Sequence, residues 1–285
     1  MWLINQIDAG IKCILKEDSE KVIFFKAIYV FVLIKLWVSW SVLESILAFI
    51  PAREYSLLGW VLHLPLHLFN YGAAAFVIVF TVILLTSLAT RLNYLSSFLV
   101  FWFSVCLSKF LYPVLNGTDL VLNLFLLIGL GVPTTPVLKW NSLKANQKLI
   151  SAFGVLLIKV EIALIYFLSG YDKLITTSWR NGDAIFAINN LDFFSNPNFV
   201  LQPGEVSALV IAWFVILFEI SFAFFVWFKK LKKYWLLAGV VFHLAIIIFM
   251  GLLDFGIIMI LSYLIFIPVK HRTTPDKSIR STLSQ

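Results

Sequence analysis

The sequence predicts an all-α polytopic membrane protein with about eight transmembrane helices, and three observations lead to this fold class. Of the 285 residues, 61% are hydrophobic and only 13% are charged. The chain holds 28 Phe and 10 Trp, which is more apolar surface than a soluble domain of this length can bury. Apolar windows long enough to cross a bilayer recur along the whole chain, and the polar gaps between them are too short to fold as soluble domains.

The elements follow one another along the chain in three parts. Residues 1–21 mix acidic and basic groups around a short apolar patch, which indicates a cytoplasmic amphipathic lead-in and not a cleavable signal peptide. Residues 22–268 form the transmembrane domain, and residues 269–285 form a basic cytoplasmic tail that is expected to be disordered. The last two spans form a tight hairpin broken at Gly251–Gly256. The expected spans are 22–50, 71–90, 95–113, 118–132, 147–170, 205–228, 234–250 and 252–268.

The distribution of Lys and Arg predicts the orientation of these spans. Fifteen lie before the first span and in every second segment after it, and three lie in the segments between. Because positive charge collects on the cytoplasmic side, both termini are expected to be cytoplasmic and segment 171–204 to face outward. That segment is rich in Ile, Trp and Phe, so we expect it to lie back on the membrane surface or to dip into the bundle.

Charge and cysteine content exclude several classes of function. The net charge of +7 is carried mostly by the loops, so topology and membrane lipids account for it and nucleic acid is not an expected partner. Cys13 and Cys106 form no CxxC pattern, and they support neither a disulfide framework nor a thiol redox centre.

Ionisable residues inside the apolar spans are the first candidates for function, because each costs about 2.5–3.5 kcal/mol to insert and needs a partner or a wet cavity. One interpretation is that they form buried ion pairs that fix helix register, and the other is that they line a water-accessible cavity that opens outward. His243 fits a hydrogen-bonded core histidine, with proton handling as the alternative. Those expected near mid-depth are Lys35, Lys159, Glu161, Glu219 and His243, and those toward the outer side are Glu44, Lys109, Asp119, Lys173, Arg180 and Asp254.

A histidine pair precedes the second span. His63 and His67 have the i, i+4 spacing of metal-binding pairs on a helix, but Pro65 between them argues against a regular helix. An interfacial segment is the favoured interpretation, and no metal site is predicted.

The stretch Gly170-Tyr-Asp-Lys173-Leu174, followed by Trp179-Arg-Asn-Gly182, resembles the Gly-x-x-Lys-Leu and Trp-x-x-Gly core of the HTTM domain, the vitamin K-dependent γ-carboxylase-like membrane domain. Further elements agree in order: Asn116-Gly-Thr-Asp119, the run that ends at Pro133, Glu219, Phe242-His-Leu244 and Tyr263-Leu-Ile-Phe266. The resemblance covers most of the chain and implies a bacterial inner-membrane protein.

By this resemblance, Lys173 matches the lysine that acts as a base on reduced vitamin K, and a reduced quinone is the implied cofactor. Asp172 stands where the carboxylase has a second lysine. The remaining residues expected to line the outward-facing site are Trp179, Arg180, Asp172, His243, Glu219, Asp119 and Lys109.

Three further interpretations stay open beside the carboxylase-like chemistry, and they leave open whether the chain is an enzyme. Compact members of this kind resemble SdpB-like proteins, which act in maturation of a secreted peptide toxin, so a secreted peptide or partner protein is an alternative partner. A quinone- or lipid-binding module without turnover is another. Lys173 can also be an interfacial anchor that extends to lipid headgroups.

Overall fold

The computed structural model describes residues 18–47, 64–65, 68, 72–90, 94–111, 117–132, 145–190, 196, 198–199 and 203–267. These residues are helical with no strand among them, which confirms the predicted all-α class. The helices are α2 (Asp18–Val38), α3 (Trp40–Leu47), α5 (Ala73–Ala89), α6 (Tyr94–Phe110), α7 (Gly117–Gly129), α8 (Ala145–Ile175), α9 (Thr177–Arg180), α10 (Asp183–Asn190), α11 (Glu205–Phe225), α12 (Lys232–Met250), α13 (Leu253–Ser262) and the 3₁₀ turn η4 (Tyr263–Phe266).

Three of these helices are long and apolar enough to cross a membrane, namely Leu149–Ile175 within α8, α11 and α12. Shorter apolar helices cover other expected spans: α5, Tyr94–Lys109 in α6, α7, and Leu253–Phe266 in α13 and η4. The chain is thus a helical protein with membrane-spanning helices, and the count of eight and the orientation stay predictions. The tail, Cys13 and the His63/His67 pair lie outside the described residues.

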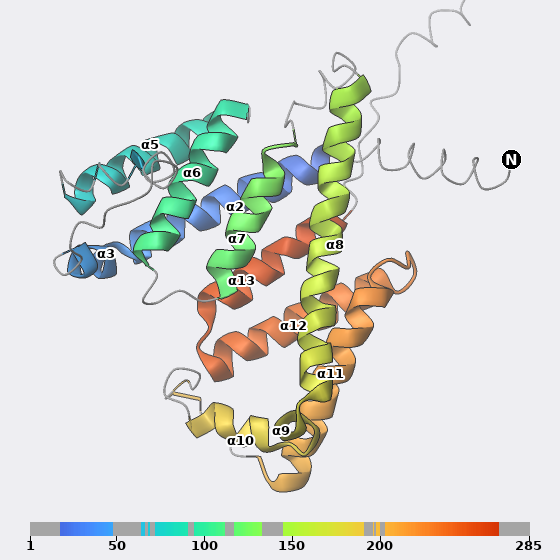
Figure 1. Ribbon diagram of the computed structural model, residues 1–285. Helices are drawn as coiled ribbons and strands as arrows, with labels where there is room; N and C mark the ends of the chain where they lie inside the picture. Colours follow the sequence, from blue (N-terminus) through green and yellow to red (C-terminus); the bar gives the residue numbers. More distant parts are fainter. Residues whose placement is uncertain are drawn as a thin grey trace, which may run out of the picture.

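The helices pack as two groups joined by the α12–α13 hairpin (Figure 1). The longest helix, α8, packs most extensively against α11, and α2 packs against α5, α13 and η4. Aromatic rings fill the core between them, as in the Phe24–Phe125 edge contact at 5.5 Å and the stacked Phe76–Phe103 pair at 5.3 Å. Such specific packing matters here because helices in lipid gain little from the hydrophobic effect.

Helix α2 begins earlier and ends earlier than the first expected span. It starts at Asp18, so Lys21 belongs to it; the Lys21 side chain is buried and donates a hydrogen bond to Ser151 Oγ of α8 at 2.7 Å. It ends at Val38, which places Lys35 in its last turn and not near the middle of a span running to residue 50. This correction brings Lys35 to a helix end, where it can meet the ends of other helices.

The α12–α13 hairpin turns at the expected position. Gly251 ends α12 in the left-handed conformation with φ of 66°, which a residue without a Cβ adopts at no steric cost. Asn196, from segment 171–204, holds the end of α12: its Nδ2 donates to Ile248 O at 2.8 Å and its backbone N–H to Phe249 O at 3.1 Å. Asn196 therefore ties this segment to the hairpin.

The described part of segment 171–204 packs back against α11, as its apolar composition predicts, but its first residues still belong to α8. Helix α8 continues to Ile175, so Lys173 lies in its last turn and not in a loop. Helices α9 and α10 then lie across the ends of α8 and α11 (Figure 1). Ile185 of α10 packs with Ala208 and Ala212 of α11 in a small buried cluster.

Candidate functional site

An ion pair joins the last turn of α8 to α11, at a point fourteen residues beyond the first residue of that helix. Lys173 Nζ of α8 donates to Glu219 Oε2 of α11 at 2.8 Å and to Oε1 at 3.1 Å. The Ser169 hydroxyl, one turn earlier on α8, accepts from the same ammonium at 2.5 Å. The Glu219 side chain is 7% exposed and that of Lys173 17%, so the pair is largely desolvated yet still reachable from one side.

A glycine lets the two helices approach closely enough for this pair. A Cβ on Gly170 would lie 3.0 Å from Glu219 Cβ and 2.8 Å from Ile220 Cγ1, closer than real side chains pack. Gly170 is therefore a notch in α8 that receives α11, in the way small residues allow close helix packing in membranes.

The first residues after α8 cover the pair. Lys173 Nζ lies 5.1 Å from the centre of the Trp179 ring, within the range of a cation–π contact. The Arg180 carbonyl accepts a hydrogen bond from the Trp213 indole at 3.2 Å, which fixes α9 against α11. The Arg180 guanidinium is exposed and donates to Thr177 Oγ1 at 3.3 Å, and the Asp172 side chain is exposed. Of the residues expected at this site, the structure thus brings Lys173, Glu219 and Trp179 into contact.

A second charged cluster lies apart from the first and contains Asp119. Lys35 Nζ is 3.2 Å from an Asp119 oxygen and 3.2 Å from Asp254 Oδ2. The Lys35 and Asp119 side chains are 5% and 2% exposed, and that of Asp254 is 37% exposed. This cluster confirms that Lys35 forms a buried ion pair. Its partners, Asp119 and Asp254, could not be identified from their spacing in the sequence.

The two carboxylates of this cluster lie at helix N-termini. Asp119 is in the first turn of α7 and Asp254 is in the first turn of α13, where the helix dipole carries about half a positive charge. One ammonium and two helix N-termini therefore balance two carboxylates. A hydrogen-bonded chain continues inward from Ser108 Oγ, which donates to Asp119 at 3.3 Å, through Asn123 to Ser104 at 2.9 and 2.8 Å.

A third polar cluster is buried between α8, α12 and η4. The Tyr166 hydroxyl lies 2.5 Å from His243 Nε2 and also hydrogen-bonds the Tyr263 hydroxyl. The Tyr166 ring stacks on Phe222 at 4.0 Å between centroids. His243 is 1% exposed, and its Nδ1 has no hydrogen-bond partner within the described part of the chain. His243 is thus hydrogen-bonded in the core through Nε2, as expected, whereas its Nδ1 has no hydrogen-bond partner among the described residues.

Sequence reasoning missed Ser169, Tyr166 and Tyr263. One face of α8 carries Tyr166, Ser169 and Lys173, which are spaced by three and four residues. This spacing is visible in the sequence, but an apolar helix face with a few polar residues gives the same pattern. The remaining ionisable candidates lie elsewhere: Glu44 and Lys109 are exposed, and Lys159 and Glu161 are half-buried.

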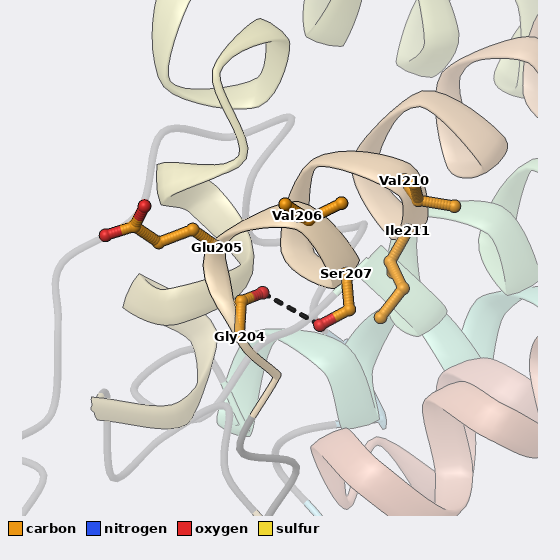
Figure 2. Close-up of a pocket in the computed structure, with 6 residues that line it drawn as sticks. All are labelled: Gly204, Glu205, Val206, Ser207, Val210 and Ile211. Atoms are coloured by element: carbon orange, nitrogen blue, oxygen red, sulfur yellow. Dashed lines mark hydrogen bonds between the residues drawn. The ribbon is translucent and has the colours of Figure 1, made fainter.

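A hollow of about 700 Å³ opens beside the first turns of α11 (Figure 2). Gly204, Glu205, Val206, Ser207, Val210 and Ile211 line it. Ser207 Oγ donates to Gly204 O at 2.8 Å within this turn, so the hollow offers few free polar groups (Figure 2). Glu219 lies eight residues beyond Ile211, the last of these lining residues, which is about 12 Å along α11 at 1.5 Å per residue. The hollow is therefore separate from the Lys173–Glu219 pair.

Together these features define the class as an all-α membrane protein with charged and polar clusters buried between its helices. Among curated proteins, the chain is similar to the sporulation-delaying protein SdpB of Bacillus subtilis (strain 168), with 27% identity over 152 residues that cover 47% of this chain and 46% of the relative. The chain thus matches about half the length of this relative. No family model and no solved structure matches the chain.

Proposed function

We propose that the chain is an SdpB-like membrane factor that acts in the maturation of a secreted peptide. The similarity to SdpB carries this proposal, because it is the one comparison that links the chain to a protein of named biological role. Membrane-spanning helices, in the plasma membrane of a bacterium, suit a factor that meets its peptide during or after export.

We place the peptide at the Lys173–Glu219 pair. The ammonium of Lys173 is a hydrogen-bond donor for a peptide carbonyl, and the carboxylate of Glu219 is an acceptor for a peptide N–H or a proton. The two groups lie 2.8 Å apart where the last turn of α8 meets α11, with Trp179 beside them. A donor and an acceptor side by side are what recognition of one peptide unit needs, and the aromatic ring adds apolar surface.

Replacement of SdpB in Bacillus subtilis by this chain tests the proposal. The secreted peptide would be followed by mass spectrometry of the culture medium, with equal membrane levels of each variant verified by immunoblot. We expect the unaltered chain to yield mature peptide, and Lys173→Met or Glu219→Gln to yield at least about tenfold less. The control variant Lys26→Met changes an exposed lysine on α2 in the same way and should cause no loss of mature peptide. No mature peptide in the medium of cells that carry the unaltered chain at a normal membrane level would refute the proposal.

The carboxylase-like alternative makes a different prediction for the same site. If Lys173 acts as a base on a reduced quinone, the purified protein consumes oxygen when a reduced quinone is added, and Lys173→Met abolishes this consumption. Oxygen consumption that depends on Lys173 therefore favours this alternative, whereas its absence from the unaltered chain favours peptide recognition.

A further inference from the structure

We propose that the turn between α11 and α12 binds the headgroup of an anionic phospholipid. This turn reads Lys229-Lys230-Leu231-Lys232-Lys233, so it holds four lysines within five residues. The sequence has no acidic residue between Glu219 and Asp254 that could neutralise them. Figure 1 shows the turn at the opposite end of α11 from α9 and α10. It is therefore a candidate binding site separate from the one proposed for the peptide.

The lengths of the flanking helices place this turn at the membrane surface. Both α11 and α12 are long and apolar enough to cross a membrane. They have 21 and 19 residues, which correspond to about 31 and 28 Å at 1.5 Å per residue. The hydrocarbon core of a bilayer is about 30 Å thick. When the two helices span the bilayer, the turn that joins them therefore lies in the headgroup layer, among the lipid phosphates.

Three of the four lysines are available to an external anion. The side chains of Lys229, Lys230 and Lys233 are exposed, and within the described part of the chain none of the three forms an ion pair with a carboxylate. Lys232 and Lys233 lie in the first turn of α12, where the helix dipole adds further positive charge. Lysine at this end of a helix is unfavourable unless an anion is close. The charge distribution thus favours a bound phosphate, which lysine ammonium groups commonly bind.

Hydrogen bonds to α11 hold the turn in a defined position. The indole N–H of Trp227 donates to Ala223 O at 2.9 Å, and the indole N–H of Trp235 donates to Ser221 Oγ at 3.0 Å. The Trp235 ring also packs against the Phe225 ring, with 4.7 Å between their centroids. Both sides of the turn are therefore fixed to the same helix, and the lysines between them are presented together.

Exposed aromatic rings beside the lysines favour a lipid over a free anion. Trp227, Phe228 and Tyr234 are exposed, and Lys233 Nζ lies 4.6 Å from the centre of the Tyr234 ring. Tryptophan and tyrosine are enriched at membrane interfaces, where the ring meets acyl chains and the polar group meets the headgroup. A phospholipid would use both the ammonium groups and the rings, whereas a free phosphate would use the ammonium groups alone.

Native mass spectrometry of the purified full chain in detergent tests the site. The protein would be titrated with phosphatidylglycerol, which is anionic, and with phosphatidylcholine of the same acyl chains, which has no net charge. The turn variant Lys229→Gln/Lys230→Gln/Lys233→Gln removes the three exposed charges. The rescue variant Lys229→Arg/Lys230→Arg/Lys233→Arg keeps these charges in the same positions.

A matched control separates a local site from an effect of net charge. The tail variant Lys270→Gln/Arg272→Gln/Lys277→Gln removes the same number of positive charges from another part of the chain. A loss of lipid preference in the tail variant as large as that in the turn variant would overturn the proposal, because net charge and not the turn would then decide binding.

We expect the unaltered chain, the rescue variant and the tail variant to bind phosphatidylglycerol at least about tenfold more tightly than phosphatidylcholine. This preference should fall below about twofold in the turn variant, and by about two- to fivefold in Lys230→Gln alone. Equal affinity of the unaltered chain for the two lipids, or an undiminished preference in the turn variant, would contradict the proposal.

Inorganic phosphate distinguishes the lipid from a free anion. At a concentration equal to that of the lipid, it should leave phosphatidylglycerol bound, because it cannot use the aromatic rings. Displacement of the lipid by inorganic phosphate would rule out a lipid site. The measurement requires no peptide, so its outcome is independent of the proposed function.

Discussion

Replacing Lys35 by Met removes the ammonium that two aspartates share. The Asp119 side chain, 2% exposed, is then left as a buried carboxylate without its cationic partner. Breaking a buried ion pair on one side costs roughly 3–5 kcal/mol, and the N-terminus of α7 offsets about 1 kcal/mol of this for Asp119. Asp254 adds little because it is 37% exposed. We therefore expect Lys35→Met to lower the free energy of unfolding by about 3 kcal/mol.

Steric trapping of the protein in bicelles measures this free energy at equilibrium. Asp254→Asn alone should cost less than about 1 kcal/mol, since its carboxylate is partly solvated. The triple variant Lys35→Met/Asp119→Asn/Asp254→Asn should recover to within about 1 kcal/mol of the unaltered chain, because it leaves no charge unpaired. A Lys35→Met variant that loses less than about 1 kcal/mol, or a triple variant no more stable than Lys35→Met, would show that this cluster is not a closed electrostatic unit.

Three further outcomes are expected. Gly239→Ala should lower the free energy of unfolding by about 1–3 kcal/mol in the same assay, because the added Cβ would overlap the Tyr263 hydroxyl. Gly204→Ala should be nearly neutral, because its Cβ would meet only Ser207 Oγ at 3.9 Å, and equal losses in the two variants would contradict close packing of Tyr263 on Gly239. In a background with Cys13 and Cys106 replaced by Ser, an impermeant maleimide added to intact cells should label Ser178→Cys and not Lys230→Cys, and the reverse pattern would invert the topology. Mass spectrometry of lipids extracted from the purified protein should show phospholipids without a stoichiometric quinone if the chain is SdpB-like, whereas a retained quinone would favour the carboxylase-like alternative.

The helical class was predictable because its signal is carried by composition and by long apolar windows. The break at Gly251 was predictable for a similar reason, since a glycine and an aspartate interrupt an apolar run locally. Helix ends were harder to place. The apolar pattern continues past Val38, where α2 ends, so the sequence placed Lys35 at mid-depth and not beside two helix N-termini.

The partners of the buried charges were not predictable from spacing. Lys35 and Asp119 are 84 residues apart, and Lys173 and Glu219 are 46 residues apart, so only the packing of the helices decides which charges meet. Tyr166 gave only the weak signal of its spacing from Ser169 and Lys173, because tyrosine is common on both the apolar and the interfacial faces of membrane helices. Tyr263 entered only as part of the family resemblance. Asp119 shows the consequence: its position near a helix end could be predicted, but its partner is Lys35 and not Lys173.

The link between Lys35 and Asp254 spans 219 residues, which has a consequence for how the chain is made. Lys35 leaves the ribosome early, and Asp254 is synthesised only after most of the chain has already entered the bilayer. Until the C-terminal hairpin arrives, Lys35 lacks one of its two counterions. The closing of this contact therefore reports that synthesis has reached the C-terminal hairpin, and a chain that ends before it would leave Lys35 with one of its two counterions.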